Sequence, residues 1–474
     1  MRPSLLAASG LVALIVTPLS GQRPTLALGV RSYVSVDTPV VALTHVRVID
    51  GTGAPARDDQ MLIIRDGNIA AIGNAQSVAI PPGAQVLDLT GKSVIPGLVM
   101  VHEHLFYPTG PGVYANLAES FTRLYLAGGV TSMRTGGDMN GFGDIGIKHD
   151  IDAGRKPGPW LDATAPYLEG LGLGLDQVHE LTGPDDARRM VNFWADEGAT
   201  SFKTYMHITQ AELGAVVEEA HKRGKKVTGH LCSVTYREAA TLGIDNLEHG
   251  FFAATDFVPD KKPDVCPGQG AGQNALAAVD LNGQAFRSLV DDLVRRHVAL
   301  TSTLTVFETF VPGRPAPPGL DVLDPQLRAQ FEQLRARVAS NPRSQYVTLY
   351  PKAAAMELAF ARAGGLLLAG TDPTGGGGVI PGYSNQHALE LLVESGFTPL
   401  EAIRIGTLNG ATYLGRANRV GFIALGKQAD IVVVTGDPSK RIADVRNVEL
   451  VFKQGIGYNP AKLIESVAGK VGLW

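Results

Sequence analysis

The sequence is poor in cysteine, in clustered positive charge and in long apolar segments. Cys232 and Cys266 are its only cysteines, so a small fold stapled by several disulfides is excluded. It has no dense run of lysine and arginine and its net charge is only −4, which argues against nucleic acid as a partner. Beyond the first residues, no segment reaches the roughly 20 apolar residues needed to span a membrane.

The first residues have the order of a secretory signal peptide. Arg2 precedes an apolar run of 13 residues, Leu5–Thr17, which small and turn-forming residues follow. We predict that residues 1–21 form a signal peptide and that the mature protein is periplasmic or secreted. That compartment would permit a disulfide between Cys232 and Cys266, and two free thiols are the alternative.

Short β patterns occur near both ends of the chain. Val40–Val48 and Gln60–Ile72 lie near the start, the second around an Asp66-Gly67 hairpin signal, and Gly421–Val434 and Val448–Phe452 lie near the end. Because a long α/β centre separates the two sets, we predict one composite β-sandwich domain made from residues 38–92 and 420–460.

The centre of the chain alternates strand and helix patterns, such as the helical pattern at Gln210–Arg223, which predicts an α/β class and a (β/α)8 TIM barrel over residues 93–419. Two long segments, 251–283 and 308–350, follow the sixth and seventh strands, and we expect loops there that shape access to a site. The eight predicted strands are Val94–His104, Val130–Arg134, Asp162–Tyr167, Thr200–Tyr205, Lys226–His230, Asp245–His249, Val298–Thr305 and Leu366–Asp372.

Metal-binding side chains occupy the ends of these strands. His102 and His104 end the first strand, and residues i and i+2 of a strand point to the same face, so both can reach one ion. At the carboxyl rim of a barrel such residues usually serve catalysis, and histidine and carboxylate groups suit zinc and similar ions. The six candidates are His102, His104, Lys203, His230, His249 and Asp372.

Several segments carry a family resemblance. Residues 94–104 (VIPGLVMVHEH), 129–134 (GVTSMR), 246–250 (NLEHG), 369–372 (AGTD) and 426–430 (GKQAD) resemble the amidohydrolase superfamily. The similarity runs from Val40 to Phe452 and is strongest to the imidazolonepropionase-like branch, which includes metal-dependent prolidases, carboxypeptidases and ochratoxin-hydrolysing amidases.

The resemblance implies a binuclear metal site. It places one divalent ion on His102, His104 and Asp372 and a second on His230 and His249, with zinc as the favoured metal. Lys203 lies where binuclear members have a lysine carboxylated on its side-chain nitrogen, which bridges both ions. The alternative is a lysine paired with a carboxylate at the barrel end.

The implied reaction is cleavage of an amide or peptide C–N bond. A metal-bridged hydroxide attacks the carbonyl, and Asp372 accepts the proton of the water and passes it to the leaving nitrogen. The expected substrate is a small molecule, a dipeptide, an N-acyl amino acid or an ochratoxin-like amide, with a free carboxylate.

Substrate contacts are assigned to three further residues. Tyr205 would hold the substrate or else pack against a loop, and Arg134 would bind a carboxylate or else support the barrel rim. His207 is a candidate for polarising the carbonyl.

Two departures from the family pattern affect specificity rather than the ligand set. Many relatives have aspartate where this chain has Thr135, and Ser-Gly-Gly where it has Pro373 to Gly378. The glycine run lacks the Lys-Ser/Thr of a phosphate loop, so nucleotide binding is rejected. The alternatives are hydrolysis of a lactone, carbamate or cyclic imide on the same site and, more remotely, a non-catalytic binding protein; by analogy with relatives, the protein would form a homo-oligomer.

Overall fold

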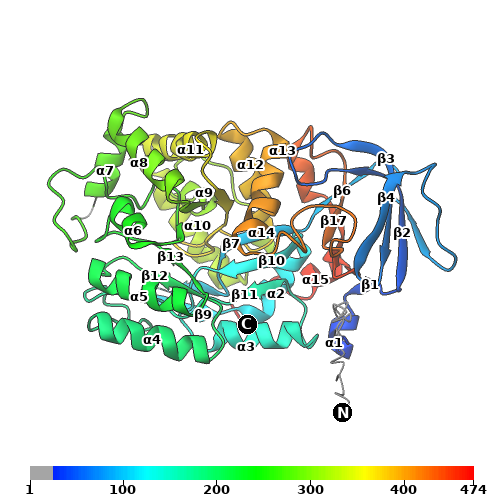
Figure 1. The fold of residues 1–474 in the computed structure, drawn as a ribbon, viewed down its shortest axis with the longest axis horizontal. Coiled ribbons are helices and arrows are strands. Elements are labelled where there is room, and N and C mark those ends of the chain that lie inside the picture. Colours follow the sequence, from blue (N-terminus) through cyan, green and yellow to red (C-terminus); the bar gives the residue numbers. More distant parts are fainter. Residues whose placement is uncertain (1–24, 111, 269, 474) are drawn as a thin grey trace, which may run out of the picture.

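The computed structural model describes residues 25–110, 112–268 and 270–473. The signal peptide predicted over residues 1–21 lies outside the described residues. Within the described part of the chain, no helix is both long and apolar enough to cross a bilayer. Figure 1 shows a β-sheet domain at one end of the molecule and a larger α/β region beside it.

Both ends of the chain build a nine-stranded mixed sheet. Its order is β1-β19-β18-β17-β6-β2-β3-β4, with β5 paired to β2. Strand β17 runs antiparallel to β6, with Ile431 opposite Pro96, and this pairing joins the two ends of the chain. The strands are β1 (Val34–Val36), β2 (Val40–Val48), β3 (Arg57–Arg65), β4 (Asn68–Asn74), β5 (Gln85–Asp88), β6 (Lys92–Pro96), β17 (Ile431–Thr435), β18 (Val448–Lys453) and β19 (Ile456–Tyr458).

This sheet follows from its sequence pattern. Val41, Leu43, Leu62 and Ile64 alternate along β2 and β3 and are buried in one apolar cluster. Between β3 and β4, Asp66 and Gly67 have φ of 47° and 82°, the left-handed pair that the Asp-Gly signal predicts for a tight hairpin. The two-ended sheet was predicted, whereas its closure into a sandwich stays a prediction.

Eight parallel strands form the α/β region in two sheets, ordered β11-β10-β7 and β12-β13-β14-β15-β16. A parallel bridge between Thr164 and Ser201 links the sheets at one side. At the other side, the N–H groups of Thr371 and Asp372 both donate to the His102 carbonyl at 3.0 Å. The strands are β7 (Leu98–Glu103), β10 (Val130–Thr135), β11 (Trp160–Asp162), β12 (Ser201–Thr204), β13 (Lys226–Gly229), β14 (Asn246–Leu247), β15 (Ala299–Ser302) and β16 (Leu367–Ala369).

Three of the predicted strands need correction. The strand expected at Val298–Thr305 is β15, Ala299–Ser302, and its last residues belong to helix α9 (Leu304–Glu308). The expected strand Val94–His104 divides at Gly97 into β6, in the nine-stranded sheet, and β7, in the parallel set. A Cβ at Gly97 would lie 2.2 Å from Thr131 Oγ1, so only glycine fits where the chain passes between sheets. The strand expected at Asp162–Tyr167 is β11, Trp160–Asp162, and the following residues make only isolated bridges.

Helices cover the parallel strands (Figure 1). The helical pattern at Gln210–Arg223 corresponds to α5. Thr209 begins α5 with a capping box to Glu212. The helices up to the sixth strand, and the one preceding β15, are α1 (Leu28–Arg31), α2 (Ala118–Ala127), α3 (Gly143–Asp152), α4 (Pro184–Asp196), α5 (Gln210–Lys222), α6 (Tyr236–Leu242) and α8 (Gln284–Arg295); a small hairpin, β8 (Phe106–Gly110) and β9 (Val113–Asn116), follows β7.

The two long segments contain more structure than expected. In the first, α7 (Ala271–Ala278) forms, and a disulfide joins Cys266 to Cys232, the outcome that the sequence left open. In the second, residues 325–339 form helix α10, because Asp324 caps the N–H groups of Gln326 and Leu327. The remaining elements are α9 (Leu304–Glu308), η1 (Leu320–Val322), α10 (Pro325–Ala339), α11 (Tyr346–Arg362), α12 (Tyr383–Glu394), α13 (Pro399–Arg404), η2 (Ile405–Asn409), α14 (Gly410–Tyr413), η3 (Ile442–Arg446) and α15 (Pro460–Glu465).

Candidate metal centre

All six predicted ligands line one cavity of about 200 Å³ at the carboxyl ends of the parallel strands. Each comes from, or directly follows, a different strand, except the two histidines of β7. Apart from the partly buried His230, each is at most 7% exposed. They are His102 (β7), His104 (after β7), Lys203 (β12), His230 (after β13), His249 (after β14) and Asp372 (after β16).

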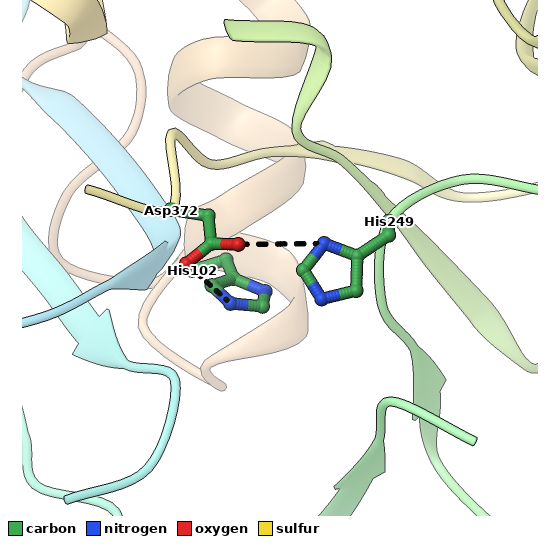
Figure 2. Close-up of side chains that lie close together, drawn as sticks. All are labelled: His102, His249 and Asp372. Carbon is green, nitrogen blue, oxygen red and sulfur yellow. Dashed lines mark ion pairs between the residues drawn. The ribbon is translucent and has the colours of Figure 1, made fainter. Parts of the chain in front are cut away.

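Asp372 contacts several of these histidines, and Figure 2 shows it with ion pairs to His102 and His249. Its Oδ1 is 3.3 Å from His104 Nε2 and 3.7 Å from His102 Nε2, and its Oδ2 is 3.8 Å from His249 Nδ1. Ligand atoms of His102, His249 and Asp372 lie within 4.8 Å of one another, a spacing that one ion can bridge. The His230 ring is next to His249, with centroids 4.3 Å apart.

Outer contacts orient the two histidines of β7. His102 Nδ1 lies 2.7 Å from Glu248 Oε2, and His104 Nδ1 lies 3.1 Å from the Gly137 carbonyl. Because each Nδ1–H donates to an oxygen, each Nε2 keeps its lone pair, and that nitrogen faces Asp372. The rings therefore hold the tautomer that a metal requires.

Two ligand positions have a strained backbone. His249 and Asp372 have φ of 67° and 55°, in the left-handed region that residues other than glycine rarely adopt. Such a conformation costs on the order of 1–3 kcal/mol and persists where surrounding contacts enforce it. The hydrogen bond from Asp372 N–H to the His102 carbonyl is one such contact.

Burial sets the protonation states that metal binding needs. Desolvation, together with the charge of Lys203, lowers the pKa of His102 to about 4 and of His230 to about 3, so both imidazoles are neutral at pH 7. Burial would raise the pKa of Asp372, but the three histidine rings around its oxygens hold that pKa well below its usual value. The centre thus offers neutral nitrogens and an ionised carboxylate.

Lys203 is buried without a carboxylate partner. Its Nζ donates to the Gly136 carbonyl at 3.2 Å and lies 5.8 Å from the centroid of the Tyr167 ring. Within the described part of the chain it makes no ion pair, so the alternative of a lysine paired with a carboxylate lacks support. Desolvation lowers the pKa of Lys203 to about 8.

Arg134 is buried, and its guanidinium is bonded to groups of the protein. It is 1% exposed; Nε donates to the Val101 carbonyl at 2.7 Å, Nη1 to Tyr413 Oη at 3.0 Å and Nη2 to Glu248 Oε1. Since Glu248 in turn is bonded to His102, Arg134 affects the site indirectly, by positioning Glu248. It does not line the cavity, so the expectation of a direct substrate contact is corrected.

The other two predicted substrate residues differ in position. Tyr205 lines the cavity, with its ring 4.9 Å from that of His230. His207 does not line it; its backbone N–H donates to Glu169 at 2.6 Å, and its role in polarising a carbonyl stays a prediction.

Two buried glutamates were missed by the sequence argument. Glu248 accepts hydrogen bonds from His102, Arg134, Thr228 and Asn246. Glu103 accepts hydrogen bonds from Asn385 and Thr371 and so ties β7 to α12 and β16. Both are direct neighbours of ligand histidines in the sequence, which was the available signal.

Comparison with known proteins agrees with this arrangement. A model of the amidohydrolase family matches residues 304–457. Imidazolonepropionase of Sphingopyxis alaskensis is 26% identical over 425 residues, which cover 85% of this chain and 90% of that protein. D-hydantoinase of Streptomyces coelicolor is 29% identical over 150 residues, which cover 31% of this chain and only 29% of that protein.

Solved structures extend the likeness to the whole fold. A Bifidobacterium longum protein provisionally described as a prolidase superposes with a TM-score of 0.67 at 25% identity, covering 90% of this chain and 98% of that chain. A Xaa-Pro dipeptidase with bound methionine (TM-score 0.67, 19% identity, 89% and 100% covered) and the ochratoxinase of A. niger (0.63, 17%, 92% and 100%) share the fold. Over most of its length the chain is thus similar to amidohydrolases, enzymes that act on C–N bonds, and its buried histidines and Asp372 form a candidate site for a divalent metal.

Proposed function

We propose that this protein hydrolyses an amide or peptide C–N bond of a small molecule, such as a dipeptide, an N-acyl amino acid or an ochratoxin-like amide. The observation that carries the proposal is the convergence of six potential metal ligands, from five strand ends, on one cavity of about 200 Å³.

The proposal includes a closed (β/α)8 barrel. Eight parallel strands follow one another in chain order, and the Thr164–Ser201 bridge and the bonds to the His102 carbonyl span the two gaps between the sheets. A barrel places all eight carboxyl ends on one rim, where enzymes of this architecture carry their active sites. The barrel would span residues 93–419, beside the sandwich of residues 38–92 and 420–460.

The side chains of the cavity fit two divalent ions. His102, His104 and Asp372 would hold one ion, and His230 and His249 the other, in keeping with neutral imidazoles and an ionised carboxylate. Lys203, carboxylated by CO2, would bridge them, since its amine is buried in the cavity wall without a carboxylate partner among the described residues. When bound, such ions polarise a carbonyl and lower the pKa of water from 15.7 to about 7, and zinc is the favoured metal.

Asp372 would move the proton. Its two oxygens face His104, His102 and His249, and its pKa lies well below the usual value, so it is ionised and can accept a proton. We assign it the proton of the attacking water, which it then delivers to the leaving nitrogen. Tyr205, on the cavity wall beside His230, would contact the substrate.

The test is metal content per chain together with hydrolysis of a panel of dipeptides and N-acyl amino acids. We expect two ions per chain, falling to one or none in Lys203→Ala with loss of turnover. The matched control is Lys453→Ala, because Lys453 Nζ also donates to a backbone carbonyl, that of Gly158, but in the nine-stranded sheet. One ion per chain, unchanged in Lys203→Ala, would overturn the bridged centre.

A second candidate reaction would use the same site to cleave a different bond. The match to a D-hydantoinase over 150 residues favours hydrolysis of a cyclic imide, and a lactone or carbamate would need the same centre. Adding a cyclic imide to the panel separates this candidate from the first.

We also propose export to the periplasm or the medium. The order of charge and apolar residues in the first 21 residues supports it, and so does the Cys232–Cys266 disulfide, since disulfides persist in oxidising compartments. Sequencing the first residues of the protein recovered from the producing cells tests this, because an intact Met1 would contradict it.

A further inference from the structure

Away from the ligand candidates, the cavity is walled almost entirely by apolar and aromatic side chains. We call these eight residues the aromatic wall: Phe106, Tyr114, Met139, Tyr167, Tyr205, Val306, Phe307 and Phe310. Several pack against one another; the Tyr167 and Tyr205 rings have centroids 4.6 Å apart, and Phe106 and Tyr114 meet edge to face at 5.6 Å. A cavity of about 150 Å³ with apolar walls can hold benzene, so about 200 Å³ accommodates a ring and an amide.

Neighbouring segments hold the wall in place from behind. Phe307, on α9, stacks on Phe252 with centroids 3.7 Å apart and an interplanar angle of 13°. A Cβ at Gly375 would lie 3.2 Å from Val306 and 3.3 Å from Phe310, and one at Gly376 only 1.8 Å from Leu334 of α10. The glycine run after Asp372 is thus the surface on which α9 and α10 pack, a role that the sequence left unexplained.

The back of α9 is held by charge. Glu308 binds Arg314 and lies 2.7 Å from Nε2 of His387 on α12. Arg314 and Arg335 line a separate cavity of about 530 Å³ that they share with Glu308. Neither lines the cavity of the six candidate ligands, which we call the metal cavity.

No arginine lines the metal cavity in the described part of the chain, and Lys203 is its only lysine. The nearest candidate for a carboxylate clamp, Arg134, has its guanidinium bonded to Val101, Tyr413 and Glu248. A substrate carboxylate placed against the aromatic wall would lose its hydration without gaining a guanidinium partner, which is costly.

The polar groups of the wall suit a neutral acceptor. Tyr167 and Tyr205 both line the cavity, and their hydroxyls have no hydrogen-bond partner among the described residues, so both can donate to a substrate. A phenol can donate to a carbonyl while its ring contacts an aromatic group of the substrate.

We propose that the site selects uncharged amides with an aromatic group beside the scissile bond and disfavours substrates with a free carboxylate there. This inference rests on the proposed amide hydrolysis and changes its preferred substrate. Dipeptides and N-acyl amino acids carry a carboxylate beside the scissile bond, so we expect both to be poorer substrates than uncharged aromatic amides. Phe307 and Phe310 are the specificity-determining residues, because both face the cavity from a segment outside the strands that carry the ligands.

The experiment compares three matched amides on the metal-loaded full chain. N-ethylbenzamide has the ring and no charge, N-ethylacetamide lacks the ring, and N-benzoylglycine adds a carboxylate to the ring compound. We expect kcat/KM for N-ethylbenzamide to exceed each of the others at least about tenfold, as a pocket does when it loses a good apolar contact or must bury a charge. Equal or better use of N-benzoylglycine or N-ethylacetamide would overturn the proposal.

Two variants link the preference to the wall. Phe310→Leu should lower the ratio of N-ethylbenzamide to N-ethylacetamide about tenfold, mainly through KM. Phe142→Leu is the matched control, because Phe142 is 52% exposed and lies outside the cavity, so the ratio should stay as in the wild type. A ratio that does not change in Phe310→Leu would remove this residue from specificity.

Calorimetric binding of the same three compounds keeps the inference separate from the proposed function. If none is hydrolysed while two ions are bound, amide hydrolysis fails, and tighter binding of N-ethylbenzamide would still support the selectivity. If all are hydrolysed and the carboxylate compound binds best, the selectivity fails and the hydrolysis stands.

Discussion

The two sides of the cavity are built by different means. On the metal side, strand ends present histidines whose outer nitrogens are bonded to Glu248 and to the Gly137 carbonyl, and Arg134 supports Glu248 from below. On the aromatic side, α9 and its neighbours are held mainly by ring stacking and by packing on the glycine run. The candidate metal ligands are therefore held in place by directional hydrogen bonds and buried charge. The shape of the substrate space depends instead on packing contacts, which can change one residue at a time.

Among the substitutions on the metal side, we expect Asp372→Asn to impair activity most. This substitution removes the proton acceptor and the charged ligand oxygen that we propose, so we expect kcat to fall about 10²–10⁴-fold, with a smaller loss of bound metal. Steady-state kinetics beside elemental analysis measures both. The control is Asp185→Asn, since the Asp185 side chain is fully exposed. Wild-type turnover in Asp372→Asn would remove Asp372 from proton transfer.

Arg134→Met tests the support beneath the metal side. It leaves Glu248 buried without its cation, so we expect a loss of about 3–5 kcal/mol in the free energy of unfolding and a metal affinity lower by about 10–100-fold. Urea unfolding and metal titration measure these. Arg188→Met, which removes exposed ion pairs to Asp185 and Glu218, should cost less than about 1 kcal/mol. Similar losses in both variants would contradict a special role for the buried pair.

On the aromatic side, reduction of the Cys232–Cys266 disulfide should lower the free energy of unfolding by about 2–4 kcal/mol, because the bond closes a long loop in the segment that includes Phe252. Urea midpoints with and without reductant measure the effect. Cys232→Ser should unfold like the reduced wild type and gain nothing from oxidant. If the urea midpoint of the wild type were the same with and without reductant, the disulfide would not stabilise the fold.

The smallest expected effect concerns pH and the back of α9. Burial alone would lower the pKa of His387, but hydrogen bonds to Glu308 and Glu390 raise it to about 9, with Arg446 also in contact with the ring and Arg314 bound to Glu308. The folded pKa exceeds the unfolded value of about 6.5, so this stabilisation is complete below pH 6.5 and is lost as the pH rises through 9.

We expect the free energy of unfolding of the wild type to exceed that of His387→Gln by on the order of 2 kcal/mol at pH 6, and by much less at pH 10. Urea unfolding of both proteins across this range gives the difference. A difference that grows with pH would mean that His387 is neutral in the folded protein.

The same division decides what could be predicted from the sequence. The convergence of the candidate ligands was predictable, because His102, His104, His249 and Asp372 end apolar strand patterns whose carboxyl ends must meet. The two-ended sheet was predictable from alternation and the Asp66-Gly67 turn. These signals are local, or repeat with the period of a strand.

The aromatic wall was not predictable, because Phe307 and Phe310 reach the cavity through a segment whose path depends on the glycine run and on α10. The role of Arg134 depended on the partner it meets, Glu248, which is 114 residues away in sequence. Helix α10 was missed although Asp324 and Pro325 form a good helix start, since the charge and proline of its surroundings suggested a loop.

The pairing of β17 with β6 has a consequence for how the molecule is made. Ile431–Thr435 reaches the ribosome's exit more than 330 residues after Lys92–Pro96, its partner strand. Until then β6 presents an unpaired apolar edge, so the sheet is the last part of the fold to be completed during synthesis, and its slow long-range pairing sets a risk of aggregation. A chain that stops before β17 would keep every ligand residue and still leave that edge open, so the sheet distinguishes finished chains from interrupted ones.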